Sequence, residues 1–160
     1  MASAKKDKNF SPEDIICTAE ANCEQSGMRL TSKRKNVLSV LLGSEVPLSA
    51  YEISERYSRR FAESITAVSV YRMLDFLISQ NLVHRLNSEN KYVACSHISS
   101  DSGHDVPQFL ICDNCQKVKE THISKDIVDA LIADVSASGF ELRHPQLELH
   151  CLCQACASVG

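Results

Sequence analysis

Residues 68–95, VSVYRMLDFLISQNLVHRLNSENKYVAC, contain the pattern that decides the fold of the first part of the chain. The first half of this stretch has apolar residues at positions i, i+3, i+4 and i+7: Val70, Met73, Leu74 and Leu77. This periodicity predicts an amphipathic helix with one buried face. Two short runs with the composition of β-strands follow, on either side of the polar turn NSEN. A helix followed by such a hairpin predicts a winged helix-turn-helix domain.

Three further helices are expected before this stretch, each with recognisable end signals. The first begins at SPED and ends at Gly27, and the second runs from Thr31 to Gly43. The third opens with SAYE, in which Ser49 and Glu52 form a capping box. Four short helices and a hairpin therefore make up the expected N-terminal domain.

The exposed face of the fourth helix carries groups that suit contact with DNA. Ser69, Tyr71 and Arg72 present a hydroxyl, a phenol and a guanidinium near its N-terminus. Further contacts to phosphate are expected from Tyr51, Lys33, Arg34 and Arg29. Cations in the first turn of the second helix oppose the helix dipole by roughly 0.3–1 kcal/mol each. A surface that meets phosphate would accept this cost, although a solvated helix face is the more common reason for a short charge run.

The overall composition hides a difference between the two halves of the chain. The 160 residues have a net charge of -3, with 44% hydrophobic and 23% charged residues, which predicts a folded protein. Residues 1–85 contain 12 Lys or Arg against 10 Asp or Glu, whereas residues 86–160 contain 5 against 10. The mildly basic half is therefore expected to bind nucleic acid, in spite of the acidic total. No apolar run approaches the length of a membrane span, and a cytoplasmic location is expected.

Two CxxC pairs supply four thiolates in the second half. ICDNC contains Cys112 and Cys115, and CQAC contains Cys153 and Cys156. Four thiolates are the donor set of a tetrahedral structural zinc site, and eight cysteines in a chain of this kind favour metal binding over disulfides. A thioredoxin-like redox pair is the alternative, but it needs only one CxxC, between a strand and a helix. The remaining cysteines are interpreted as bystanders: Cys17, Cys23 and Cys151.

Four other residues of ligand type lie between the hairpin and the first CxxC pair or just after it: His84, Cys95, His104 and Glu120. Taken singly, each has an ordinary explanation as a junction, strand-end, loop or surface residue. Their spacing alone does not connect them.

The chain as a whole resembles the ferric-uptake-regulator superfamily. The matching segments occur in order along nearly its whole length: RLTSKRKNVL, SAYEI, VSVYRMLDFL, LVHRL, KYVAC, FLICDNCQKVKE and GFELRHPQLELHCLC, followed by CQAC. Within the superfamily the chain looks most like the zinc-uptake-regulator branch, whose members are homodimeric winged-helix repressors of zinc-import genes. The resemblance implies two zinc ions per subunit. A structural ion would be held by Cys112, Cys115, Cys153 and Cys156, and a regulatory ion at the hinge by His84, Cys95, His104 and Glu120.

The thiolate of Cys95 bears on the choice of metal. A sulfur, two nitrogens and an oxygen suit tetrahedral zinc better than octahedral iron or manganese. The loop around His104 is longer than in the relatives that the chain resembles, which leaves His97 as a possible substitute. A third metal site stays open, with candidate ligands from His97, His122, His144 and His150.

These observations predict an α+β chain with a winged helix-turn-helix domain at 1–85, a hinge at 86–91 and a small α/β dimerisation domain at 92–160. The segment SKDIVDALIADVSASG predicts a helix whose apolar stripe serves the core, the dimer interface or both. The expected function is a zinc-responsive repressor that binds operator DNA as a homodimer, with no membrane and no small-molecule substrate. The alternatives are an iron or peroxide regulator, a zinc enzyme and a structural-zinc adaptor that does not bind DNA.

Overall fold

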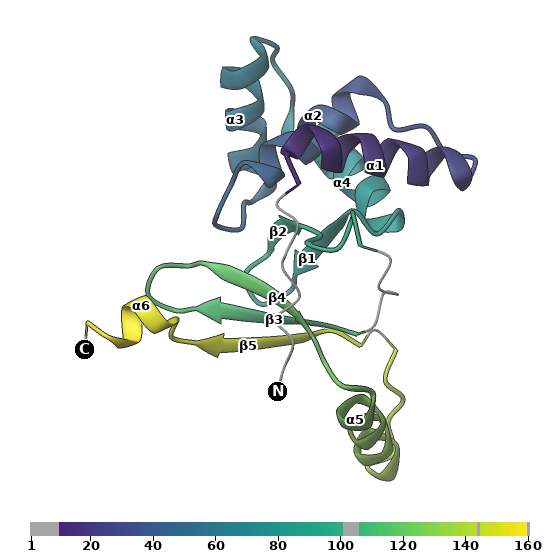
Figure 1. The fold of residues 1–160 in the computed structure, drawn as a ribbon, viewed down its shortest axis with the longest axis vertical. Helices are drawn as coiled ribbons and strands as arrows, with labels where there is room; N and C mark the ends of the chain where they lie inside the picture. The colour runs from purple at the N-terminus through teal and green to yellow at the C-terminus, as the bar shows by residue number, and fades with distance from the viewer. Residues whose placement is uncertain (1–9, 101–105, 144, 160) are drawn as a thin grey trace.

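The computed structural model describes residues 10–100, 106–143 and 145–159. Its elements are, in order, α1 (Pro12–Gln25), α2 (Ser32–Leu42), α3 (Ala50–Phe61), α4 (Ala67–Ser79), β1 (Val83–Leu86), β2 (Lys91–Ala94), β3 (Pro107–Cys112), β4 (Val118–His122), α5 (Lys125–Ala137), β5 (Leu147–Cys151) and α6 (Gln154–Ala157). Figure 1 shows the four N-terminal helices above the β1–β2 hairpin, with the C-terminal sheet below it. This is the mixed helix-and-sheet architecture that the sequence predicts.

The N-terminal helices begin where the sequence places their caps. Ser49 accepts a hydrogen bond from the N–H of Glu52, whose carboxylate accepts one from the N–H of Ser49, so the expected capping box is present in α3. The stripe predicted on α4 faces the core, because Val70, Leu74 and Leu77 are fully buried there. One apolar cluster joins the four helices to the hairpin.

The wing, residues 83–94, is the antiparallel hairpin of β1 and β2. Leu86 pairs with Lys91, so the segment 86–91 that is expected as a hinge forms the hairpin turn. Leu48 and Tyr92 exchange backbone hydrogen bonds, which ties β2 to the loop before α3. The limits of the two domains stay a prediction. Because β2 is bonded to the loop before α3, we propose that the connection to the C-terminal part begins after Ala94.

The C-terminal sheet has the strand order β4-β3-β5. β3 is antiparallel to β4 and parallel to β5, with Cys112 opposite Cys151. The parallel pairing matters for the site, since it places the carboxyl ends of β3 and β5, and the CxxC pair that follows each, at the same edge of the sheet. β4 contains Glu120, in a segment that is not expected as a strand from its residues.

Two apolar surfaces have different surroundings. Leu86 of the wing packs with Phe109 and Ile111 of β3 in a small cluster that joins the hairpin to the C-terminal sheet. Helix α5 instead lies apart from the rest of the chain (Figure 1), and none of its residues is buried. The stripe on α5 therefore does not serve this chain's own core, which was one of its two expected uses. Among the described residues, no helix is long and apolar enough to cross a membrane.

Candidate metal centres and DNA-binding face

The cysteine cluster consists of Cys112, Cys115, Cys153 and Cys156, whose sulfur atoms all lie within 4.8 Å of one another. The turn after β3 presents the first pair, and the N-cap and body of α6 present the second. Sulfurs bound to one tetrahedral zinc at about 2.3 Å would lie about 3.8 Å apart. The sulfurs of Cys115 and Cys153 lie 3.7 Å apart and form no disulfide, so the spacing fits that ion.

The thiols of this cluster are prepared for metal binding by their backbone surroundings. Hydrogen bonds from the N–H groups of Cys115 and Cys153 lower the pKa of Cys112 to about 6. The neighbouring thiols raise the pKa of Cys156 to about 11, against the opposing effect of Asn114. The lowered pKa of Cys112 favours its thiolate, which is the form that binds a cation.

The hinge cluster consists of His84, Cys95 and Glu120, whose ligand atoms also lie within 4.8 Å of one another. His84 belongs to β1, Cys95 follows β2, and Glu120 belongs to β4. The three side chains thus come from both the wing and the C-terminal sheet. The fourth expected ligand, His104, lies outside the described residues.

An orphaned nitrogen marks the hinge cluster as a place where a cation fits. Nε2 of His84 is buried and has no hydrogen bond among the described residues, although it lies 3.2 Å from Oε1 of Glu120. The ring of Phe109 packs against His84 with the centroids 5.2 Å apart. A nitrogen held in this way beside a buried thiol and a carboxylate matches the S, N, O chemistry of a zinc site.

The charges of the hinge cluster are set by burial and by close donors. Burial raises the pKa of Glu120, but the His84 ring, the Ser96 N–H and the His97 ring outweigh this effect and lower it to about 2. Burial, with the charge of Glu120, raises the pKa of Cys95 to about 12. The thiol of Cys95 lies 3.9 Å from Oε1 of Glu120 and is oriented to donate to it. A bound cation would therefore replace the thiol proton between a sulfur and a carboxylate.

Ser96 is a supporting residue that the sequence did not single out. Its N–H and its hydroxyl both donate to Oε2 of Glu120, at 2.9 and 3.1 Å. Oε1 is left facing His84 and Cys95. The one sequence feature that points to Ser96 is its position directly after Cys95.

The histidines considered for substitution or for a third site are not brought together as one group. His97 lies 3.2 Å from Glu120 through Nδ1, and its ring packs against His122 at 4.0 Å between centroids. His150 is instead bound to Asp113 at 2.7 Å, beyond the end of β3. His144 lies outside the described residues. His97 therefore adjoins the hinge cluster, whereas a third site remains without support from the described residues.

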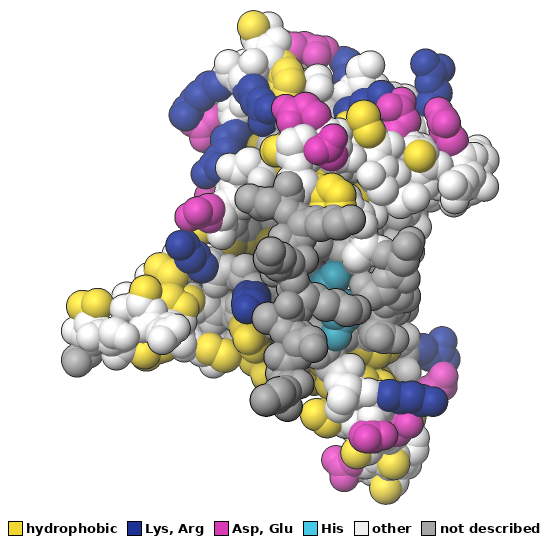
Figure 2. Space-filling view, in the orientation of Figure 1, with side chains coloured by type: hydrophobic (Ala, Val, Ile, Leu, Met, Phe, Trp, Pro, Cys, Tyr) yellow, Lys and Arg dark blue, Asp and Glu magenta, His cyan; other side chains and the backbone are white. Residues whose placement is uncertain are grey.

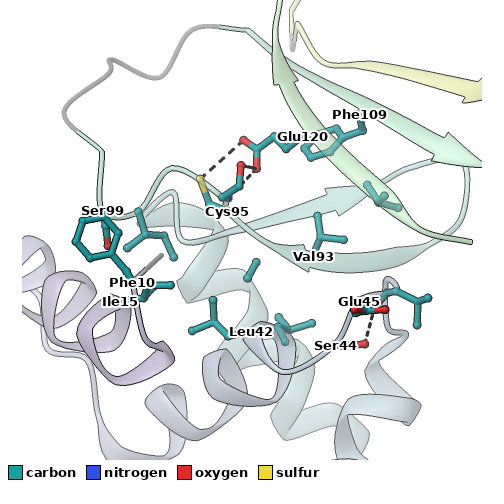
Figure 3. Close-up of a pocket in the computed structure, with 16 residues that line it drawn as sticks. Phe10, Ile15, Leu42, Ser44, Glu45, Val93, Cys95, Ser99, Phe109 and Glu120 are labelled. Carbon is teal, nitrogen blue, oxygen red and sulfur yellow. Dashed lines mark hydrogen bonds between the residues drawn. The ribbon is translucent and has the colours of Figure 1, made fainter. Parts of the chain in front are cut away.

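A cavity of about 350 Å³ lies behind the hinge cluster, between the N-terminal helices and the C-terminal sheet. Figure 3 shows Cys95 and Glu120 on its wall, facing Ile15 and Leu42 across the opening. Most of its lining is apolar. The hinge cluster thus borders a cavity between the N-terminal helices and the C-terminal sheet. The direct apolar contact between the two parts of the chain is made by the wing.

The expected DNA-binding residues divide into exposed groups and internally paired groups. Tyr51 of α3 is 71% exposed and Tyr71 of α4 is 37% exposed, and Arg72, the next residue of α4, is exposed as well. Lys33 forms a salt bridge of 2.7 Å with Glu63. Arg34 lies over the ring of Phe76 and donates to the carbonyl of Arg29.

A groove of about 610 Å³ brings several of these residues together at the N-terminal ends of α2 and α4. Its lining is Arg29, Thr31, Ser32, Lys33, Arg34, Ser69, Arg72 and Met73. Figure 2 shows Lys and Arg side chains gathered with acids over this helical part of the molecule. The groove combines cations and hydroxyls, which are the groups that contact a nucleic-acid backbone and base edges. Tyr51 is not part of this lining.

Comparisons with known proteins agree with the two-part architecture. The model of the ferric uptake regulator family matches residues 25–150. The zinc uptake regulation protein of Escherichia coli K12 is 35% identical over 147 residues, covering 92% of this chain and 84% of that protein. A solved zinc uptake regulator complexed with zinc and DNA has a TM-score of 0.83 at 32% identity, covering 94% of this chain and 98% of its own.

One relative has been solved in two states, and the two differ in their likeness to this chain. The holo structure of XcZur has a TM-score of 0.79 at 36% identity, covering 92% of this chain and 99% of its own. The apo structure of XcZur has a TM-score of 0.50 at the same identity, covering 91% and 97%. The arrangement of the two parts described above is therefore closer to the holo structure than to the apo structure.

Proposed function

The chain belongs to the ferric uptake regulator family, and we propose from this premise that it is a zinc-responsive repressor. It binds operator DNA as a homodimer when zinc occupies the hinge cluster, and it represses genes of zinc uptake. The observation that carries the proposal is the hinge cluster, in which a wing histidine, a buried thiol and a carboxylate of the C-terminal sheet converge. The likeness to zinc-bound and DNA-bound relatives supports it.

We propose two zinc ions per subunit with different roles. The cysteine cluster would hold a structural ion, whose bonds join the ends of β3 and β5 in a part of the chain with a small core of its own. The hinge cluster, completed by His104 or by the adjoining His97, would hold the regulatory ion. Bound there, zinc supplies a cross-link between the wing and the C-terminal sheet.

The residues of the hinge cluster would turn metal occupancy into DNA affinity through the angle between the two parts. His84 moves with the wing and the helices, whereas Glu120 moves with the C-terminal sheet, so their separation changes when the parts rotate. In a dimer this rotation sets the distance between the two recognition helices, which must be about 34–36 Å to enter successive major grooves. The ion would select the competent angle with a coupling free energy of about 1–3 kcal/mol.

Helix α5 supports the homodimer. Its exposed apolar side chains include Ile127, at 58%, and Ile132, at 42%. Figure 2 shows hydrophobic side chains beside acids at the foot of the molecule, where α5 lies in Figure 1. A second copy of the chain would cover this face, and the sheet edges beside it could pair in the same interface.

The donor set favours zinc over the alternative of an iron or peroxide regulator, because a thiolate ligand suits zinc. We also propose that the chain is no enzyme and acts in the cytoplasm, where its DNA lies. Four protein ligands leave no coordination position for a substrate.

The test uses a DNA duplex selected from a random pool by the zinc-loaded protein. Binding of this duplex is measured by fluorescence anisotropy while zinc, iron(II) or manganese(II) is titrated into the full-length protein. Zinc should restore binding at the lowest concentration. Binding restored best by iron(II), or by no metal at all, would contradict the proposal. A Cys95→Ser variant should lose the zinc response, with Cys17→Ser, a change at an exposed cysteine of α1, as the matched control.

A further inference from the structure

We propose that Glu148 is a positioning residue that clasps the turn of the wing to the C-terminal sheet, and that this clasp sets how much zinc the hinge cluster needs. The inference rests on the proposed function and deepens it. It assigns part of the zinc response to an interaction in which no metal ligand takes part.

The clasp is made by one carboxylate and two successive backbone amides. Oε1 of Glu148 accepts a hydrogen bond from the N–H of Asn87 at 2.6 Å, and Oε2 accepts one from the N–H of Ser88 at 2.8 Å. The two donors open the turn between β1 and β2, and the acceptor lies in β5. Both oxygens of the carboxylate are therefore used, and they join segments that are far apart in the chain.

Gln146 holds the carboxylate and the wing at the same time. Its Nε2 donates to Oε1 of Glu148 at 2.9 Å and to the carbonyl of Arg85 at 2.8 Å. Gln146 lies directly before β5, and its hydrogen bond to Glu148 shows that the two side chains project to the same side. The backbone of the wing thus donates N–H groups to Glu148 and accepts a hydrogen bond from Gln146 at a carbonyl oxygen.

Apolar packing under the clasp limits where the wing can sit. Glu148 lies opposite Phe109 in the parallel β3–β5 pairing, so the two side chains are neighbours on one face. Phe109 is fully buried against Leu86 of the wing. The carboxylate caps this cluster from its rim and is itself partly buried. Charge-assisted bonds at the rim of an apolar contact are stronger than bonds in open solvent.

The carboxylate is ionised under ordinary conditions. Burial raises the pKa of Glu148, but the donors of Ser88, Asn87 and Gln146 outweigh it and lower the pKa. The clasp is therefore charged, and an amide at the same position would keep the shape while losing the charge. This makes Glu148→Gln the appropriate variant.

The clasp and the hinge cluster stabilise the same arrangement of the two parts. His84 lies on β1 and the clasped amides lie in the turn after β1, so both interactions hold the same hairpin to the same sheet. Two interactions that favour the same arrangement of the wing and the sheet are thermodynamically linked. Weakening the clasp therefore lowers the apparent affinity of the hinge cluster for zinc. A weaker clasp must therefore raise the zinc concentration that the hinge cluster needs, without any change in the ligands.

The experiment compares the full-length protein with its Glu148→Gln variant at fixed structural zinc. Zinc binding at the hinge is measured without DNA by competition with a fluorescent chelator. The affinity for the selected duplex is then measured at saturating zinc. Glu148→Gln should need about tenfold more zinc for half-occupancy, as expected for loss of a charged hydrogen bond. It should reach the DNA affinity of the wild type once zinc is saturating.

This pair of results separates positioning from other roles. A variant that only damages the fold loses DNA affinity at every zinc concentration, and so does a variant that removes a DNA contact. Either outcome would overturn the inference, and so would an unchanged zinc requirement. The matched control is Glu141→Gln, an exposed glutamate of the same half that contacts only Arg143 among the described residues. Its zinc requirement should equal that of the wild type.

Amide hydrogen exchange keeps the inference distinct from the proposed function. The amides of Asn87 and Ser88 should exchange slowly in the zinc-loaded wild type and faster in Glu148→Gln. If the wild type shows no zinc-dependent DNA binding, the proposed function fails while exchange still tests the clasp. Equal exchange in both proteins would show that the clasp does not form, whatever the protein binds.

Discussion

Nε2 of His84 lies 3.2 Å from Oε1 of Glu120, although one residue belongs to the wing and the other to the C-terminal sheet. Only 8% of the Glu120 side chain and 16% of the His84 side chain are exposed. Both side chains are largely buried, and two ligand atoms bound to one tetrahedral zinc at about 2.0–2.1 Å would lie about as far apart as this nitrogen and oxygen do. The pair joins the two parts of the chain at one point, and its chemistry leads directly to a test.

The variant His84→Ala should lose the regulatory ion and keep the structural one. Removing one of four ligands should weaken zinc binding at the hinge by more than about 100-fold, since removing even a ligand's supporting partner costs 10–100-fold. Native mass spectrometry should find one zinc per subunit where the wild type holds two. His150→Ala is the control, because the ring of His150 is bound to Asp113 beyond the end of β3, and a loss of zinc that is equal in both variants would contradict the assignment.

The variant Cys153→Ser should unfold the C-terminal part. The cysteine cluster joins β3 to β5 beside a core of only a few buried residues, so losing its ion removes much of what stabilises this half. Thermal unfolding followed by circular dichroism should show a large decrease in melting temperature, and chelation of the wild type should reproduce it. Cys151→Ser is the matched control, because the sulfur of Cys151 lies outside the cluster. Wild-type stability of Cys153→Ser would exclude a structural role.

The variant Arg72→Ala should weaken operator binding without changing zinc binding. An arginine that contacts a base contributes about 1–3 kcal/mol, which is about 5–150-fold in affinity. Anisotropy titrations with the selected duplex measure this loss. Arg143→Ala removes an exposed arginine from the C-terminal half and should leave affinity unchanged. An unaltered affinity in Arg72→Ala would favour the adaptor that does not bind DNA.

The variant Glu63→Gln should strengthen DNA binding. Lys33 is paired with Glu63, so part of its attraction to phosphate is cancelled before DNA arrives. Without the carboxylate, affinity should rise about two- to fivefold, because one more cation is free to neutralise a phosphate. The slope of the logarithm of the DNA association constant plotted against the logarithm of the salt concentration should become more negative by up to about 0.9. No change in affinity or slope would mean that Lys33 stays away from DNA.

The variant Ile132→Asp should weaken the dimer. A charge on the apolar stripe of α5 would have to be buried without a partner in the interface. Sedimentation velocity should show that the dissociation constant of the dimer is at least about tenfold higher than that of the wild type. Ala133→Asp places the same charge on the opposite face of the helix and should leave the dimer intact. If both proteins remain dimeric at all concentrations, another surface forms the interface.

Local signals explain why much of the fold could be predicted. The capping box of Ser49 and Glu52 and the apolar periodicity of α4 depend on residues within one or two helical turns. The two CxxC pairs likewise predict one ion, because each pair is a single turn with fixed ligand spacing. The two strand-like runs also predict the hairpin, but composition alone does not separate its polar turn from a hinge between domains.

The sequence by itself determined the N-terminal helices, the hairpin, the cysteine donors and the sign of charge in each half, because these depend on short-range geometry and composition. Tertiary structure alone decided that Lys33 is paired with Glu63 and that the stripe of α5 lies open. It also decided that Glu120 meets His84 and that Glu148 holds the wing turn. Each of these contacts depends on strand register and on the relative placement of two packed parts, and no local pattern of residues encodes that placement.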